Sequence, residues 1–198
     1  MNYLQIYDPN LKVKPHVTEQ EAKAIWNEAA KPHVRMLIKT LWYTGLRITE
    51  ALTIKACDIV REGLDFSVLV YREKQFKNSK KKPRKAPEPE QDKVPIPRDF
   101  GLDLYDYAIR EGIKGQQRLF PANRSTYWRQ VRECAKRAGI PNWHKVHPHS
   151  FRHGFVYDKA MKGVHPYVLS KLAGHSQLKT TMEYYQPTEA DLRKAVEL

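Results

Sequence analysis

Apolar residues recur at helical spacing near the start of the chain. Thr18 and Glu21 have the spacing of a capping box, in which the hydroxyl accepts a backbone N–H and the carboxylate reaches back. This pattern predicts the start of a helix. The side chains expected on its buried face are Ile25, Trp26 and Ala29.

A second helix is expected to begin at Pro32, because proline is tolerated in the first helical turn. Its inward positions are Val34, Leu37, Ile38, Leu41 and Trp42. Gly45 is expected to end it, since glycine adopts the left-handed conformation at low cost. A third helix is then predicted from Arg47 to about Ala56.

The middle of the chain has strand-like stretches. Residues 57–60 and 64–71 are rich in β-branched and aromatic side chains, which predicts two strands. Residues 94–96 predict a third short strand, and Pro95 limits it to a sheet edge. A long hairpin loop is expected between the second and third strands, over residues 74–92.

From Arg98 onward the apolar spacing is helical again. Helices are predicted at about 99–111, 125–138, 149–162, 166–173, 177–186 and 188–197. The expected fold class is α+β, mostly α, with about eight to nine helices and one small three-stranded antiparallel sheet. Residues 1–16 are interpreted as a lead-in or linker remnant and residues 17–198 as one domain.

The composition is strongly basic. Lys and Arg number 35 against 22 Asp and Glu, which gives a formal net charge of +13. Residues 74–85 hold seven basic residues and no acidic one, namely Lys74, Lys77, Lys80, Lys81, Lys82, Arg84 and Lys85. This charge favours a polyanionic partner, and nucleic acid is the commonest one. The alternative is a basic surface that only aids solubility.

Other features of the composition limit the compartment. No segment approaches the ~20 apolar residues that a membrane helix needs, and the N-terminus lacks the layout of a secretory signal. Cys57 and Cys134 give no disulfide framework and suit a reducing cytoplasm. We interpret both as small core residues and expect a cytoplasmic protein associated with DNA in the nucleoid.

Phosphodiester cleavage without a metal requires positive donors for the phosphate oxygens, a nucleophile and an acid for the leaving oxygen. Arginine suits the first task because its planar fork bonds two oxygens and stays charged. Arg47 stands at a predicted helix start, and Glu50 lies on the same helical face and is positioned to orient it. The alternative is an ordinary surface Arg–Glu pair.

A second group of candidates lies in the segment His-Pro-His-Ser-Phe-Arg-His at 147–153. His149, Arg152 and His153 occupy positions i, i+3 and i+4 of a predicted helix, so they share one face. Phe151 and Phe155 are expected to fill the core on the other side. Gly-His follows at 174–175, and Thr-Thr-Met-Glu-Tyr-Tyr at 180–185.

These motifs, in this order, resemble the catalytic domain of the tyrosine recombinases, the phage integrase family, over about residues 17–198. The resemblance implies that Arg47 and Arg152 clamp the phosphate. It implies that His149 transfers a proton to or from the nucleophile, with His153 in a structural role. It further implies that His175 donates a hydrogen bond to the scissile phosphate.

The resemblance also implies the nucleophile and the general acid. Tyr184 and Tyr185 would point about 100° apart on a helix, and the family pattern of two threonines, two residues and a tyrosine selects Tyr184. The family places its lysine acid at the turn after the second strand, where Lys74 is the first candidate and Lys77 the second. The remaining loop bases are expected to bind DNA, namely Lys80, Lys81, Lys82, Arg84 and Lys85, together with Lys77.

The implied function is a site-specific DNA recombinase or integrase of a mobile element, which acts through a 3′-phosphotyrosyl intermediate and needs no metal, ATP or other cofactor. The implied partner is double-stranded DNA, on which four copies of the chain assemble at two sites from free monomers, with residues 189–198 docking on a neighbour. The N-terminal core-binding domain common in the family is expected to be absent, so the chain is either a fragment or a naturally short member.

Two other functions are compatible with parts of this pattern. A non-catalytic basic module that binds or regulates DNA would explain the charge but not the ordered motifs. A metal hydrolase is suggested by His144, His147, His149 and His153, because histidines at i and i+4 can chelate zinc. The glutamate of a His-Glu-x-x-His helix is missing, however.

Overall fold

The computed structural model describes residues 16–72, 91–185, 193 and 196 of the chain. The elements, in chain order, are α1 (Glu19–Asn27), α2 (Pro32–Thr44), α3 (Ile48–Ala51), the 3₁₀ helix η1 (Ala56–Asp58), β1 (Ile59–Glu62), β2 (Asp65–Tyr71), β3 (Gln91–Ile96), α4 (Arg98–Arg110), α5 (Arg124–Arg137), the 3₁₀ helix η2 (Trp143–Lys145), α6 (Pro148–Met161), α7 (Pro166–Ala173) and α8 (Leu178–Met182).

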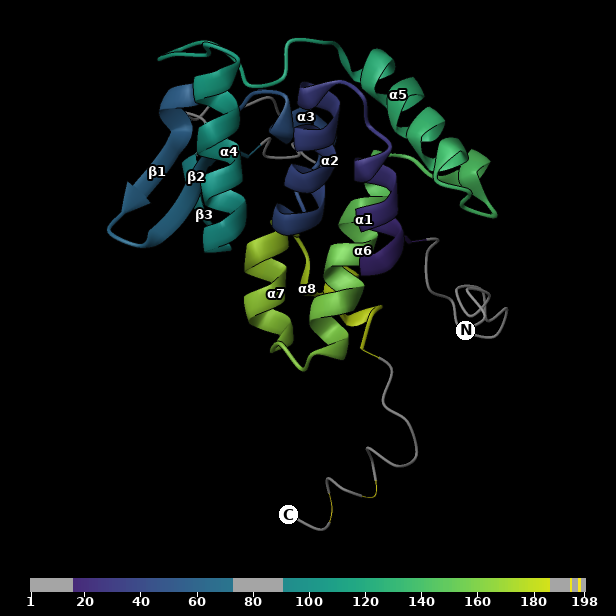
Figure 1. Ribbon diagram of the computed structural model, residues 1–198. Helices are drawn as coiled ribbons and strands as arrows, with labels where there is room; N and C mark the ends of the chain where they lie inside the picture. Colours follow the sequence, from purple (N-terminus) through teal and green to yellow (C-terminus); the bar gives the residue numbers. More distant parts are fainter. Residues whose placement is uncertain (1–15, 73–90, 186–192, 194–195, 197–198) are drawn as a thin grey trace, which may run out of the picture.

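Helix α2 lies in the middle of the molecule (Figure 1). It packs against α1 and α6 on one side and against α4 on the other. The sheet lies beyond α4, α5 packs on α1 at the opposite side, and α7 and α8 gather next to α6. The expected fold class is confirmed: the described residues are mostly helical, with one three-stranded antiparallel sheet.

The sheet has the strand order β1-β2-β3, so β3 is an edge strand, as Pro95 requires. In the register of β2 and β3, Val68 pairs with Val94 and Phe66 pairs with Ile96, and all four side chains are buried. Phe66 also packs tightly on α4 at Gly101, where an added Cβ would lie 2.3 Å from its ring. The sheet is thereby fixed to the helical body.

The buried apolar side chains form two clusters. The larger one contains side chains from helices α1, α2, α3, α4, α5 and α6 and from the sheet, including Leu37, Phe100 and Phe151. The smaller one consists of Phe155, Val156, Ala160, Leu169, Ala173 and Tyr184. Helix α6 contributes to both, because Phe151 enters the larger cluster and Phe155, one turn later, enters the smaller. Helix α6 therefore connects the two clusters.

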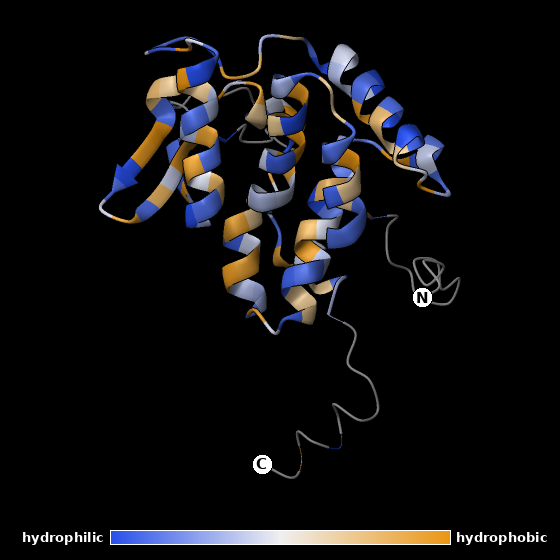
Figure 2. Ribbon diagram, in the orientation of Figure 1, coloured by the Kyte–Doolittle hydropathy of each residue, from blue (hydrophilic) through white to orange (hydrophobic). Residues whose placement is uncertain are grey.

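Helix α5 is the most polar of the long helices, and Figure 2 shows it as largely hydrophilic with a narrow apolar stripe. Its buried residues are Tyr127, Val131, Cys134 and Ala135, at spacings of three and four. Asn123 caps its start by accepting a hydrogen bond from the Thr126 backbone N–H at 2.9 Å. The helix thus presents a broad polar face to solvent.

Most of the expected elements are confirmed, including the capping box of α1, the buried face of α2 and the left-handed Gly45 at its end, with φ of +63°. Three predictions are wrong. Helix α3 ends at Ala51, helix α8 ends at Met182, and Cys57 is exposed in η1 instead of buried in a strand. The backbone turns at Cys57 because its N–H bonds the Gly115 carbonyl oxygen at 2.9 Å, outside any strand ladder.

Several predictions lie outside the described residues. They are the lead-in over residues 1–15, the hairpin loop between residues 73 and 90, and most of the helix at 188–197. Arg193 and Val196 are described, and both are helical. No helix among the described residues has the length and apolarity needed to cross a membrane.

Gly45→Ala should destabilise the fold far more than Gly63→Ala, although both glycines have nearly the same positive φ, +63° and +61°. Left-handed backbone costs either alanine about 1–2 kcal/mol. At position 45 the new Cβ would also fall 2.4 Å from the Phe155 ring, whereas nothing lies within 4 Å at position 63. Overpacking should add about 1–3 kcal/mol at position 45. Urea unfolding of both variants measures the difference, and equal losses would contradict this account.

Candidate active site

Arg47 is held in place by Glu50. It is the N-cap residue of α3, directly after the turn that ends α2. One Glu50 carboxylate oxygen accepts the Arg47 backbone N–H at 2.9 Å, and the other accepts the guanidinium Nη1 at 2.9 Å. The Glu50 side chain is fully buried, so the carboxylate is committed to these contacts. The orientation expected from the sequence is confirmed.

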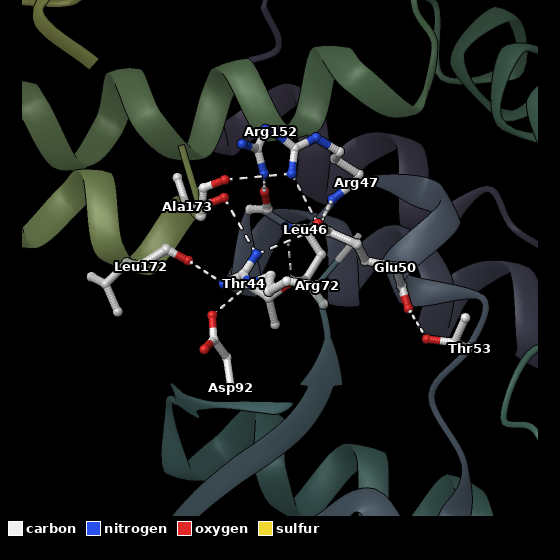
Figure 3. Close-up of polar contacts among 12 residues, drawn as sticks. Thr44, Leu46, Arg47, Glu50, Thr53, Arg72, Asp92, Arg152, Leu172 and Ala173 are labelled. Atoms are coloured by element: carbon white, nitrogen blue, oxygen red, sulfur yellow. Dashed lines mark hydrogen bonds and ion pairs between the residues drawn. The ribbon is translucent and has the colours of Figure 1, made fainter. Parts of the chain in front are cut away.

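Arg152 is anchored by the same turn. It lies on α6, is 5% exposed, and donates from Nη1 to the Gly45 carbonyl oxygen at 2.5 Å. Burial and the neighbouring Arg47 lower the pKa of Arg152 to about 10, so the guanidinium remains charged at neutral pH. The turn between α2 and α3 thus positions both arginines. Arg47 follows this turn directly in the chain, and Arg152 donates to its Gly45 carbonyl oxygen. In Figure 3 the two guanidinium groups point into the same region.

A third arginine, which the sequence reasoning missed, joins this group. Arg72 follows β2 directly, and its guanidinium contacts Glu50 and Asp92 as well as backbone carbonyl oxygens at the end of α7 (Figure 3). Its position next to a basic loop gave no local signal, because its partners lie 20 to 101 residues away. The described site therefore holds three guanidinium groups, of which those of Arg47 and Arg72 pair with carboxylates.

His175 is placed by the turn between α7 and α8. Gly174 ends α7 in the left-handed conformation, with φ of +65°, and its carbonyl oxygen accepts Arg47 Nη1 at 3.4 Å. His175 Nδ1 hydrogen-bonds the buried hydroxyl of Thr181 at 2.7 Å. The sequence reasoning used Thr181 only to locate the tyrosine, whereas the structure gives it a contact that sets the orientation of the imidazole.

Tyr184 is buried at the edge of the smaller apolar cluster, where it is 5% exposed. It follows α8 in a turn, so the expected placement of Tyr184 and Tyr185 on one helix is wrong. The Tyr184 hydroxyl hydrogen-bonds His153 Nδ1, and the two rings stack with centroids 6.2 Å apart. Burial raises the pKa of Tyr184 to about 12, and the positive charge of Arg152 acts in the opposite direction.

The contact between Tyr184 and His153 differs from the sequence-based expectation. His149 was expected to exchange a proton with the nucleophile, and His153 to be structural. Both are half-buried on α6, with ring centroids 6.5 Å apart. The turn after α8 places the Tyr184 hydroxyl against His153, which lies one helical turn beyond His149 on α6. His153 is thus the imidazole that touches the phenol.

His149 belongs to a row of rings that leads from α5 to Tyr184. Trp128 stacks on His147 with centroids 6.1 Å apart, and His147 meets His149 edge-on at 6.2 Å. Burial, followed by the positive charge of Arg152, lowers the pKa of His149. The imidazole is therefore neutral at pH 7 in the free protein and is able to accept a proton.

The remaining candidate residues lie outside the described part of the chain. Lys74 and Lys77, the expected general acids, lie outside the described residues, as do the other expected DNA-binding residues, namely Lys80, Lys81, Lys82, Arg84 and Lys85. Over the part of the chain that the structure describes, no group of three or more His, Cys, Asp or Glu side chains is arranged to hold a metal ion.

The pKa of His149 can be tested in the free protein by NMR. Its titration midpoint should fall below 6.5, because the buried, positively surrounded site favours the neutral ring. The corresponding stability is present above pH 6.5 and is lost as the pH falls through the lowered pKa. Arg124→Gln should raise the midpoint, since Arg124 is one of the charges that lower it. Arg129→Gln, on the same helix, is the control; a wild-type midpoint at or above 6.5 contradicts the assignment.

The chain is similar in sequence to known tyrosine recombinases. The sequence is 28% identical to the tyrosine recombinase XerA of Pyrococcus furiosus over 194 residues, which cover 91% of this chain and 60% of that protein. It is 30% identical to a tyrosine recombinase of Thermosipho africanus, covering 93% of this chain and 62% of that protein. The chain thus spans about three fifths of the length of these two relatives.

The fold is also similar to that of solved structures. The XerH site-specific recombinase bound to its difH substrate superposes with a TM-score of 0.70 at 20% identity, covering 94% of this chain and 53% of that chain. The catalytic domain of bacteriophage HP1 integrase gives a TM-score of 0.60 at 19% identity, covering 92% of this chain and 94% of that domain. The sequence pattern of the phage integrase family matches residues 15–191. The chain is therefore a member of the phage integrase family.

Proposed function

We propose that this chain cuts and rejoins DNA as a site-specific recombinase or integrase, through a 3′-phosphotyrosyl intermediate. The observation that carries the proposal is the convergence of Arg47 and Arg152 at one turn, with Tyr184 near enough for the charge of Arg152 to act on its phenol. Two fixed guanidinium groups and a phenol are the parts that phosphoryl transfer to a tyrosine needs.

In the proposed reaction, the scissile phosphate occupies the region between Arg47 and Arg152. The Tyr184 oxygen attacks the phosphorus, a P–O bond to the phenol forms, and the P–O bond to the 5′ oxygen breaks. The arginines stabilise the negative charge that builds on the non-bridging oxygens. Because the phosphodiester energy is kept in the covalent link, a free 5′-hydroxyl attacks it in reverse and restores the strand without ATP or a metal.

Proton transfer accompanies both bonds. We assign the acceptance of the Tyr184 proton to His153, because its Nδ1 contacts the phenol, and a secondary role to His149, whose lowered pKa keeps it neutral. His175, oriented by Thr181, is proposed to donate to the phosphate. The departing 5′ oxygen requires an acid, for which Lys74 remains our first candidate and Lys77 our second.

The proposed partner is double-stranded DNA. The net charge of +13 supports this, and among the proteins of similar fold the XerH recombinase was solved on its DNA substrate. We further propose that four copies act together on two DNA sites, that they are monomers before binding, and that the protein works at the nucleoid. The basic residues between 74 and 85 are proposed to contact the phosphate backbone.

Tyr184→Phe should abolish covalent protein–DNA adducts, since no other atom replaces the attacking oxygen. The purified chain is incubated with a library of nicked duplexes of random sequence. Adducts that survive detergent are isolated, and their 3′ junctions are sequenced. Tyr185→Phe is the matched control, because the hydroxyl of Tyr185 is engaged elsewhere, on the Val164 carbonyl oxygen.

The two tyrosine variants separate the possible outcomes. Adducts in wild type and Tyr185→Phe but not in Tyr184→Phe support the proposal. Adducts that persist in Tyr184→Phe contradict the assignment of the nucleophile. DNA that binds to wild type in a salt-dependent manner without any adduct would favour the non-catalytic binding module instead.

His153→Asn should slow adduct formation by about 10²-fold or more, the usual contribution of general acid–base catalysis. Asparagine can still hydrogen-bond the phenol but cannot take its proton. The adduct rate of wild type should fall as the pH drops and the imidazole gains a proton, and this dependence should be lost in the variant. The same change at exposed His144 is the control. An unchanged pH–rate profile in His153→Asn would return the proton-acceptor role to His149.

A further inference from the structure

Arg72 joins three parts of the chain that lie far apart in sequence. Its Nε donates to Asp92 on β3 at 2.9 Å, and its Nη1 donates to buried Glu50 on α3 at 3.4 Å. Its Nη1 and Nη2 also donate to the carbonyl oxygens of Ala173 and Leu172, at 3.4 and 3.0 Å. The side chain is only 10% exposed. Each of its three nitrogens therefore has a protein acceptor.

The contacts with α7 occur where that helix needs them. The last carbonyl groups of a helix lack hydrogen-bond partners within it and carry negative partial charge. A guanidinium at this end donates hydrogen bonds to these carbonyl groups and supplies the opposite charge. Gly174 follows directly, and a Cβ at that position would lie 2.5 Å from Arg72 Nη1. The close approach therefore requires glycine, and it fixes the turn from which His175 projects.

Arg72 also acts on Arg47 through Glu50. The two arginines share the carboxylate: Arg47 Nη1 binds Oε1 at 2.9 Å, and Arg72 Nη1 binds Oε2 at 3.4 Å. Both also touch the end of α7, Arg72 at residues 172 and 173 and Arg47 at the Gly174 carbonyl oxygen, 3.4 Å away. Displacing Arg72 would thus disturb the orientation of Arg47 and the position of His175 together.

We infer that Arg72 is a positioning residue of the proposed reaction: it ties the turn that carries His175 to β3 and to the Arg47–Glu50 pair, and does not itself bind the phosphate. The inference rests on the proposed function, since it concerns the geometry of the same site. It differs from the phosphate-clamp role of Arg47 and Arg152 because the donors of Arg72 are already directed at carboxylate and carbonyl oxygens.

The main test is the rate of adduct formation at saturating protein, on a nicked duplex built from the sequence that wild type traps. Arg72→Ala should lower this rate by about 10²-fold, the effect expected when catalytic groups are misplaced by about 1 Å. DNA affinity and its salt dependence should stay close to wild type, because no phosphate contact is lost. Arg110→Ala removes the same charge at an exposed position of α4 and serves as the matched control.

A second substrate separates positioning from direct phosphate contact. An uncharged methylphosphonate at the scissile position leaves less charge to neutralise, so Arg47→Ala should lose less rate on it than on natural DNA. Arg72→Ala should lose the same factor on both. If Arg72→Ala instead loses less rate on the methylphosphonate than on natural DNA, as Arg47→Ala does, Arg72 is a phosphate ligand and the inference is overturned. A wild-type rate in Arg72→Ala overturns it as well.

Arg72→Lys covers the case in which the alanine variant folds poorly, as judged by its melting temperature. A single ammonium cannot reach all four acceptors, so the lysine variant should fold normally and show an intermediate adduct rate. Full recovery with lysine would mean that charge alone is needed, which contradicts a role in positioning.

Hydrogen exchange tests the structural part of the inference without DNA. In Arg72→Ala, but not in Arg110→Ala, the amides of Gly174 and His175 should exchange faster, because their bonds to the Lys171 and Ser170 carbonyl oxygens belong to the tied turn. Unchanged exchange overturns the inference by itself. If wild type traps no DNA at all, the proposed function fails, and the catalytic part of the inference fails with it.

Discussion

The buried carboxylate of Glu50 is the contact on which the arrangement of the site depends. It lies between α3, the end of β2 and the end of α7, where one oxygen accepts the Arg47 guanidinium and the other accepts the Arg47 backbone N–H and the Arg72 guanidinium. A carboxylate without solvent is tolerable only when it is paired, and removing one partner of such a pair typically costs about 3–5 kcal/mol. The charge of Glu50 therefore contributes to the stability of the fold and also sets the orientation of Arg47, for which we propose a role in phosphate binding.

Helix α6 organises the other half of the site. Phe151 anchors it in the larger apolar cluster and Phe155 in the smaller. Arg152 reaches from this helix to the turn after α2, and His153 reaches to the phenol. One helix thus links the turn after α2 to Tyr184, because neighbouring residues of α6 contact each of them.

Local patterns predicted what local forces determine. The capping box at Thr18, the amphipathic face of α2 and the glycine that ends it follow from hydrogen bonds and burial within a few residues, and all were confirmed. The partner of Tyr184, the role of Thr181 and the contacts of Arg72 depend on where segments up to about a hundred residues apart meet. No periodicity encodes that meeting. The family resemblance supplied the candidate groups and gave the proton-transfer role to His149, whereas the structure shows His153 in contact with the phenol.

The placement of Tyr184 in the small cluster has an energetic consequence. Among the described residues six buried side chains form that cluster, and each large one contributes about 1.5–3 kcal/mol of burial. Moving Tyr184 out of this cluster would expose one large side chain, whereas the larger cluster, which contains Leu37, Phe100 and Phe151, would keep its contacts. In the proposed reaction, DNA bound to the larger body would supply the free energy that exposing this side chain costs.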